Sequence, residues 1–141
     1  MRQVEGYSLW LGHRGDLGDP QRIADLGVVA VVDLAINEVP ATLPRDFTYC
    51  RFPLIDGTGN PCWLLQVAVQ TVAWLVRANT PTLVCCGAGL SRSPCIAGAA
   101  VAFVRGCSLD EALAFVVRSG PADVSPALWS EVCAACSPSR F

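Results

Sequence analysis

The chain has 141 residues, of which 52% are hydrophobic and 16% charged, and its formal net charge is -2 at pH 7. This length is typical of one domain, so residues 1–141 are expected to form a single domain around one hydrophobic core. The hydrophobic content excludes an intrinsically disordered chain, and the slightly acidic balance argues against a nucleic-acid binder held by a basic surface.

Short apolar runs at intervals along the chain predict strands. The clearest is Val28 to Val32, a continuous and mostly β-branched run that is typical of a strand buried on both faces. The other expected strands cover residues 9–11, 47–54 and 82–85.

Capping residues and helix breakers between these runs predict helices. Asp19-Pro20 is typical of a helix start because Asp accepts from the first free amides and Pro fits the first turn. Gly27, Gly106 and Gly120 are expected to end helices. The expected helices begin near Pro20, Asn60-Pro61, Ser91, the Ser108–Glu111 capping box and Ser125-Pro126, and the second runs to about Arg77. Strands that alternate with helices indicate an α/β fold with a mainly parallel sheet.

Membrane insertion and a disulfide framework are both disfavoured. The longest apolar stretch, Cys62 to Val76, contains Gln and Thr and is shorter than the roughly 20 residues that a span needs. The first residues lack the apolar core of a signal peptide, so a cytoplasmic location is expected, where thiols stay reduced. Cys133-x-x-Cys136 has the spacing of half a zinc site, but no second pair exists and His13 is the only histidine. No metal or other cofactor is therefore expected.

The segment from Val84 to Ser93 combines features that suit a tetrahedral anion. A strand ends at its start and a helix begins at its end, and Gly87 and Gly89 allow successive backbone amides to turn inward as an anion nest. The helix N-terminus adds amide donors and its dipole, and Arg92 can close the ring with a bidentate fork. Cys86 at the floor of this positive cup would be favoured as a thiolate nucleophile.

The pattern Cys86-x-x-Gly89-x-Ser91-Arg92-Ser93 resembles the signature of the dual-specificity phosphatases, within the cysteine-dependent protein tyrosine phosphatase superfamily. The resemblance extends over nearly the whole chain. It includes the opening strand at Leu9–Gly12, the buried strand within 27–37, and the helices around Ser93-Pro94 and 108–113. It implies a sheet covered by helices on both faces and metal-free hydrolysis of phosphate monoesters.

The resemblance also implies a role for each residue of the signature. Cys86 is expected to be the nucleophile that forms a phosphocysteine intermediate, and Ser93 to stabilise the departing thiolate. The three phosphate oxygens are expected to be held by Arg92 and the backbone amides of the loop, that is by Gly87, Ala88, Gly89, Leu90, Ser91 and Arg92.

The leaving oxygen needs a proton, which the family supplies from an Asp on a loop about thirty residues upstream. Asp56 lies thirty residues before Cys86, just after an expected strand, and is the candidate acid and base. The alternative for Asp56 is an Asx-turn residue, and Ser91 has the alternative of capping the helix. Asp33 and Asp46 are expected to make local hydrogen bonds, and His13 to face solvent.

The chain departs from the family pattern immediately before the nucleophile, where Cys85 replaces the usual His. That His helps to organise the loop, so we expect a less optimised enzyme. Cys85 is also one candidate partner for an oxidised Cys86, although adjacent cysteines form strained disulfides, and Cys50 and Cys95 are others.

The neutral loop residues offer no grip for the extra phosphates of an inositol lipid. A shallow cup for phosphotyrosine, with phosphoserine and phosphothreonine as further substrates, is the main expectation, on a phosphorylated protein or a small phosphate monoester; an RNA 5'-phosphate stays open. No membrane or nucleic-acid partner is expected. Two other functions compete with this reading: a catalytically silent phosphate-binding module, and a rhodanese-type sulfurtransferase. The Arg at the sixth position after the Cys argues against the latter.

Overall fold

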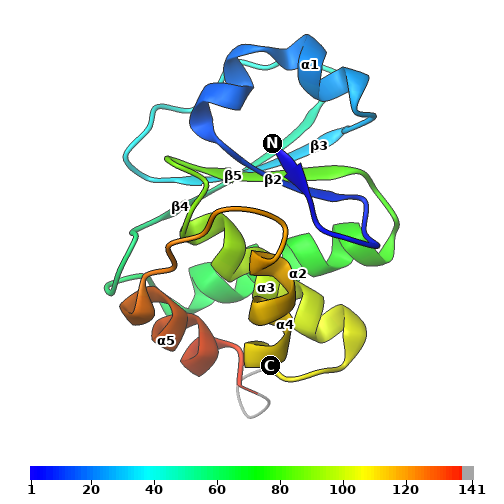
Figure 1. The fold of residues 1–141 in the computed structure, drawn as a ribbon. Helices are drawn as coiled ribbons and strands as arrows, with labels where there is room; N and C mark the ends of the chain where they lie inside the picture. Colours follow the sequence, from blue (N-terminus) through cyan, green and yellow to red (C-terminus); the bar gives the residue numbers. More distant parts are fainter. Residues whose placement is uncertain (138–141) are drawn as a thin grey trace.

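A computed structural model describes residues 1–137, and the last four residues of the expected domain, 138–141, lie outside the described residues. The strands come as two consecutive pairs and a fifth strand, separated by helices, and only helices follow the fifth strand (Figure 1). The strands are β1 (Arg2–Gln3), β2 (Leu9–His13), β3 (Ala30–Ala35), β4 (Thr48–Leu54) and β5 (Thr82–Cys86). The helices are η1 (Arg14–Gly18, 3-10), α1 (Pro20–Asp25), α2 (Cys62–Arg77), α3 (Arg92–Arg105), α4 (Leu109–Val117) and α5 (Pro126–Ala135).

The strands form one sheet in the order β1-β2-β5-β3-β4. All neighbours pair in parallel except β1, which pairs with β2 in the antiparallel direction. Helices α2 to α5 lie on one side of the sheet, and η1 and α1 lie on the other (Figure 1). The expected mainly parallel sheet with helices on both faces is confirmed. Because β5, β3 and β4 are parallel neighbours, their carboxyl ends meet at one edge, where ligands bind in folds of this class.

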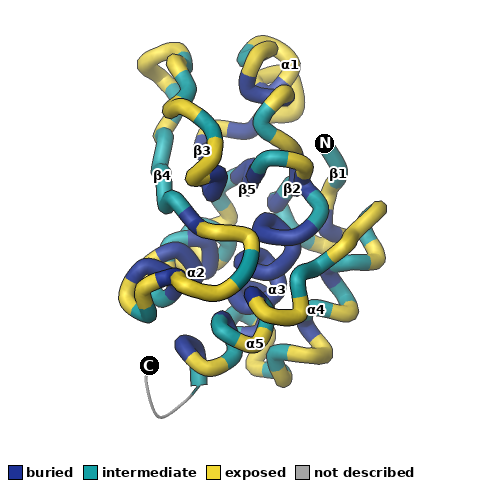
Figure 2. The backbone as a smooth tube through the Cα atoms, turned by 90° about the vertical axis from the view of Figure 1, so that its left-hand side faces the viewer, coloured by how far each residue is buried: buried dark blue, intermediate teal, exposed yellow. Residues whose placement is uncertain are grey.

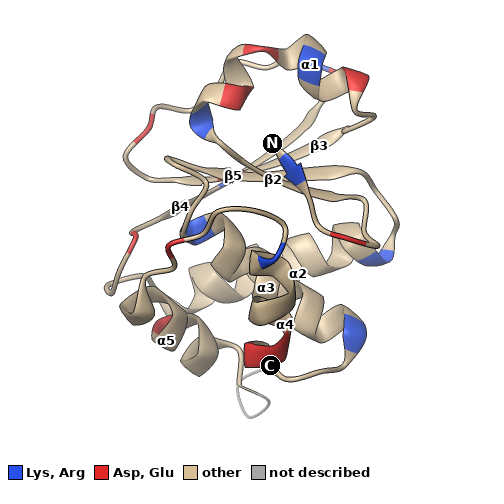
Figure 3. Ribbon diagram, viewed as in Figure 1, with Lys and Arg blue, Asp and Glu red and all other residues tan. Residues whose placement is uncertain are grey.

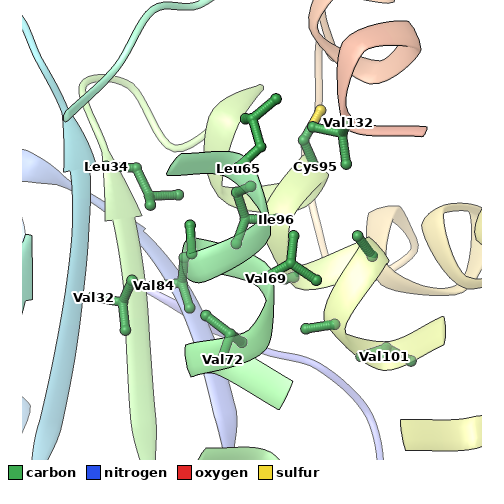
Figure 4. Close-up of a cluster of buried hydrophobic side chains, with 14 of the residues drawn as sticks. Val32, Leu34, Leu65, Val69, Val72, Val84, Cys95, Ile96, Val101 and Val132 are labelled. Carbon is green, nitrogen blue, oxygen red and sulfur yellow. The ribbon is translucent and has the colours of Figure 1, made fainter. Parts of the chain in front are cut away.

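The larger hydrophobic cluster fills the space between the sheet and α2, α3 and α5 (Figure 4). Val32 and Val84 of the sheet face Val69 and Val72 of α2 and Ile96 of α3 there. Helix α3 is buried from Arg92 to Ala102, and its run of small residues lets α4 approach closely. The buried strands and α3 form the dark centre of the molecule in Figure 2. Helix α3 is therefore fixed on several sides, and so is the site at its N-terminus.

The structure corrects three details of the sequence-based expectations. The strand predicted over 28–32 is displaced to Ala30–Ala35 and continues through the buried Asp33, whose carboxylate has hydrogen-bond partners that allow burial. The edge strand β1 was not predicted, because two residues carry too little pattern. Asn60 does not cap α2: its side chain instead bonds to the backbone of Ile55 and Gly57, which braces the turn after β4.

Charged residues are concentrated in loops and near helix ends, and the strands and α2 carry few of them (Figure 3). None of the helices in residues 1–137 is both long enough and apolar enough to cross a membrane.

Candidate active site

Cys86 is the last residue of β5, and α3 begins six residues later at Arg92. The segment between them, together with these two residues, is called the 86–92 loop below. Cys86 is only 2% exposed, and its Sγ accepts a hydrogen bond from the amide of Gly89 at 3.2 Å. The loop therefore folds over the side chain of its first residue, Cys86, and places the sulfur of that residue near the N-terminus of α3.

The carbonyl oxygens of the 86–92 loop point outward to donors in other segments. Gly87 O accepts from the amide of Arg14, Gly89 O from the Arg2 guanidinium, and Leu90 O from the amide of Asp123. In a trans peptide the N–H points opposite to the C=O, so the amides that follow these carbonyls turn to the inner side of the loop. This is the arrangement of an anion nest, and it is continuous with the N-terminus of α3.

Gly89 is required by the loop's backbone path. Its φ of +76° lies in the left-handed region, and a Cβ at this position would come within 2.8 Å of Gly12 O in β2. Both the conformation and the close approach exclude a side chain.

Arg92 is 7% exposed, and its guanidinium is held along one edge. Nη1 donates to Asn37 Oδ1 at 2.9 Å and to the carbonyl oxygen of Leu54 at 3.0 Å. Nε is buried and has no hydrogen-bond partner among residues 1–137. A buried guanidinium N–H without a partner is costly, and an anion bound in the loop would satisfy it.

Asp56 lies on the segment after β4, where Ser91 Oγ donates to its Oδ1 at 2.6 Å. The same hydroxyl accepts from the amide of Ser125 at 2.9 Å. Ser91 occupies the N-cap position of α3, but its side chain makes no capping hydrogen bond. The helix-cap alternative for the Ser91 hydroxyl is therefore wrong, because that hydroxyl ties Asp56 and the α4–α5 connection to the loop.

A cavity of about 140 Å³ opens between these groups. It is lined by the expected nucleophile Cys86, the expected acid Asp56 and the expected phosphate-binding Arg92. The full set of lining residues is Asp56, Cys86, Ala88, Leu90, Ser91, Arg92 and Asp123. Sequence reasoning missed Asp123, because it lies on the α4–α5 connection, far downstream and without a motif. It also missed Asn37, although its place just after a buried strand at the carboxyl edge of the sheet was a usable signal.

Ser93 is completely buried, and its Oγ has no hydrogen-bond partner among the described residues. The expected hydrogen bond between this hydroxyl and the Cys86 sulfur is not made. His13, at the end of β2, has a side chain 52% exposed, as expected, and Asp33 bonds locally to the Ala35 amide.

Cys85 faces away from the cavity. Successive side chains of a strand point to opposite faces, and Cys85 packs in the cluster on the α1 side while Cys86 packs toward α3. Burial raises the pKa of the Cys85 thiol, and the neighbouring carboxylate of Asp33 adds to the rise. Asp33 is the register partner of Cys85, and its oxygens accept from Tyr49 Oη at 2.6 Å and the Ala35 amide at 3.1 Å.

The chain has matches among known protein families and solved structures. Residues 9–135 match the model of the family described as "Dual specificity phosphatase, catalytic domain". The chain belongs to this family. It is thus a protein-tyrosine/dual-specificity phosphatase by family, and the sulfurtransferase alternative loses its support.

Solved structures agree with this assignment. Human DUSP28 superposes with a TM-score of 0.82 at 26% identity, covering 96% of this chain and 94% of its own. Tk-PTP, described as in the active form, gives 0.75 at 26% identity, covering 99% and 97%. A mouse putative dual specificity phosphatase complexed with zinc tungstate gives 0.82 at 23% identity, covering 95% and 84%, and supports the fold alone. Comparison with curated protein sequences gives no match.

Proposed function

We propose that this phosphatase domain hydrolyses phosphate monoesters through a phosphocysteine formed on Cys86. The observation that carries the proposal is the unpartnered, buried Nε of Arg92 at the wall of a cavity that also contains Cys86. A phosphate dianion in this cavity would accept from Arg92 and from the inward amides of the 86–92 loop, and would neutralise the positive N-terminus of α3.

In the first half of the proposed reaction, the Cys86 thiolate attacks phosphorus and the bond to the leaving oxygen breaks. Asp56 gives its proton to that oxygen. In the second half, Asp56 takes a proton from a water molecule, which attacks the phosphocysteine and releases inorganic phosphate and the thiolate. The contact of Asp56 with Ser91 supports this role, because it fixes the carboxyl beside the loop while Oδ2 has no hydrogen-bond partner among residues 1–137. Ser93, with its free buried hydroxyl, is proposed to stabilise the thiolate as it leaves.

The proposed substrate class is a phosphotyrosine-containing protein or a related aryl phosphate, with phosphoserine and phosphothreonine as weaker substrates. Apolar Leu90 and Ala88 in the lining, and the exposed Ile55 beside Asp56, suit a ring more than a charged headgroup. Asp123 adds negative charge to the same walls and would repel further phosphates. We propose a cytoplasmic location, as predicted from the sequence, where the thiols of the eight cysteines would stay reduced.

The test is hydrolysis of phenyl phosphate or a phosphotyrosine peptide in the presence of a metal chelator. The wild-type chain should turn over. Cys86→Ser should lose turnover and keep inorganic phosphate binding, because serine preserves the shape of the cavity but is not a thiolate. Cys107→Ser, which alters a thiol outside the cavity, is the matched control. Substantial turnover by Cys86→Ser would contradict the assignment of Cys86 as the nucleophile.

A second candidate function, a phosphate-binding module without turnover, is favoured by two observations. Cys85 stands where the family has His, and the Ser93 hydroxyl makes no hydrogen bond to the Cys86 sulfur. The same experiment separates the two candidates, since a silent module binds phosphate in the wild type but releases none from an ester.

A further inference from the structure

Asn37 contacts the guanidinium that forms one wall of the candidate active site. It follows β3, fifty-five residues before Arg92, and accepts from Arg92 Nη1 at 2.9 Å. Leu54 O takes the other hydrogen bond of the same nitrogen at 3.0 Å. The Nη1 edge of Arg92 is therefore saturated by the protein, and its Nε is left without a partner.

The two faces of the Asn37 amide are used differently. Its Oδ1 is engaged by Arg92, and its Nδ2 lies beside Gly87, 3.5 Å from where a Cβ would stand at that glycine. The same Cβ would come within 2.9 Å of Arg92 Nη2, so the Asn37 amide and the guanidinium lie together over the start of the 86–92 loop.

The segment that carries Asn37 is anchored at both ends to the buried carboxylate of Asp33. Asp33 Oδ1 accepts from the amide of Ala35 at 3.1 Å, and Oδ2 accepts from Tyr49 Oη, which itself accepts from the amide of Ala41 at 2.9 Å. The segment is braced further by Arg51, whose Nη2 donates to Ala35 O and Glu38 O. Asn37 is exposed to solvent, yet the hydrogen bonds of Ala35 before it and Ala41 after it fix its position in the chain.

We infer that Asn37 is a positioning residue that holds the guanidinium of Arg92 so that its Nε–Nη2 fork is presented to the phosphate. The inference rests on the proposed function. A neutral amide oxygen suits this role better than a carboxylate, because it accepts from Arg92 without neutralising the charge that attracts the phosphate dianion.

The first test is a double-mutant cycle on inorganic phosphate affinity and on kcat and KM for an aryl phosphate. Asn37→Ala removes one of the two acceptors of Nη1, and a hydrogen bond to a charged group of this kind corresponds to about a tenfold loss in kcat/KM. Both KM and kcat should change, since the fork is used in the ground state and in the transition state. In an Arg92→Lys background, which has no fork to orient, Asn37→Ala should change phosphate affinity by less than about twofold.

Two further variants separate positioning from a general loss of loop structure. Val39→Ala alters the same segment at a side chain that is 74% exposed, and it should leave kinetics and phosphate binding unchanged. Asn37→Asp keeps an acceptor for Arg92 but adds a negative charge, so it should keep the guanidinium fixed and still weaken phosphate binding, less so at high salt. Equal losses for Asn37→Ala in the wild-type and Arg92→Lys backgrounds would overturn the inference, as would full phosphate affinity in Asn37→Ala.

The second test reads the guanidinium directly and does not depend on turnover. In ¹⁵N–¹H NMR spectra, hindered rotation about the Cζ–Nη1 bond of Arg92 should give two resolved Hη signals on Nη1 in the wild type, because each of these hydrogens has its own acceptor. Asn37→Ala should speed their exchange, and unchanged signals would contradict the inference. A wild type that neither binds phosphate nor hydrolyses an ester would defeat the proposed function, whereas the NMR comparison would still report whether Asn37 holds Arg92.

Discussion

Gly89 offers a sharp test of how tightly the 86–92 loop is held, because its substitution by Ala has two separable costs. The first is conformational: at a φ of +76° a side chain other than hydrogen costs about 1–2 kcal/mol. The second is steric. The new Cβ would lie 2.8 Å from Gly12 O, and β2, which carries Gly12, is locked in parallel register with β5. Forcing an extra methyl group into a packed contact costs about 1–3 kcal/mol.

Gly106 provides the matched control for the conformational cost alone. Its φ is +70°, and a Cβ added there meets nothing within 4 Å. Gly106→Ala should therefore destabilise the fold by about 1–2 kcal/mol and Gly89→Ala by about 2–5 kcal/mol. For a chain of this size the expected falls in Tm are about 5 °C and about 10 °C, measured by circular dichroism.

The two variants should differ more in activity than in stability. Shifting Gly89 displaces the amide that donates to Cys86 Sγ, so Gly89→Ala should lose at least about tenfold in kcat/KM on an aryl phosphate. Gly106→Ala, at the far end of α3, should keep the wild-type rate at a temperature where both are folded. If Gly89→Ala has the same Tm as Gly106→Ala and retains full activity, the close approach to Gly12 does not constrain the loop.

Other consequences can be measured on the same substrates. Asp56→Asn should slow the hydrolysis of phenyl phosphate by about 10²–10⁴-fold and that of a nitrophenyl phosphate much less, because only the more basic phenolate oxygen needs a proton as it leaves. An equal loss of rate for both esters would reject the role of Asp56 as the acid. Cys85→His should speed alkylation of Cys86 by iodoacetamide at pH 6, and an unchanged profile would show that the backbone of the loop and the helix terminus act alone. Burial raises the pKa of the Cys95 thiol to about 12, with the Asp56 carboxylate adding to the rise, so iodoacetamide at pH 7–9 should spare Cys95 in the folded chain and label it only at much higher pH or after unfolding.

The sequence was sufficient for the parts of the site that lie on one continuous segment. The signature from Cys86 to Ser93 predicted a strand, a turn with two glycines and a helix, and the structure has this order with α3 starting at Arg92. Local chemistry decides such a segment, since the glycines and the helix start are properties of neighbouring residues. The same holds for the helix ends at Gly106 and at Ser108, whose hydroxyl accepts from the Glu111 amide.

The contacts that orient the site could not be predicted in this way. Asn37 follows β3, Leu54 ends β4 and Asp56 follows it. Asn37 and Leu54 bond to Arg92, and Asp56 bonds to Ser91, only because these strands lie beside β5 in the order β5-β3-β4. Alternation of strands and helices predicts a parallel sheet but does not give the order of its strands. Hydrophobic pattern was also misleading at Asp33, where a charge suggested the end of a strand that in fact continues to Ala35.

The presence of Cys85 in place of His is a second case in which the sequence alone does not show what holds the loop. Sequence comparison with the family predicts a disturbed loop, since a side chain that helps to organise it is missing. In the structure the Asp33 carboxylate beside Cys85 has its oxygens bonded to Tyr49 and to the Ala35 amide, so this carboxylate does not depend on a partner at position 85. Cys85 itself fills an apolar contact on the α1 side of the sheet. The loop is held instead from outside, by the donors from Arg2, Arg14 and Asp123 to its carbonyl oxygens, and these residues lie in three segments that no local pattern connects. Removing an outer donor, as in Arg2→Ala, should therefore disturb the loop more than Cys85→Ala does, and phosphate affinity measured on both variants compares the two directly.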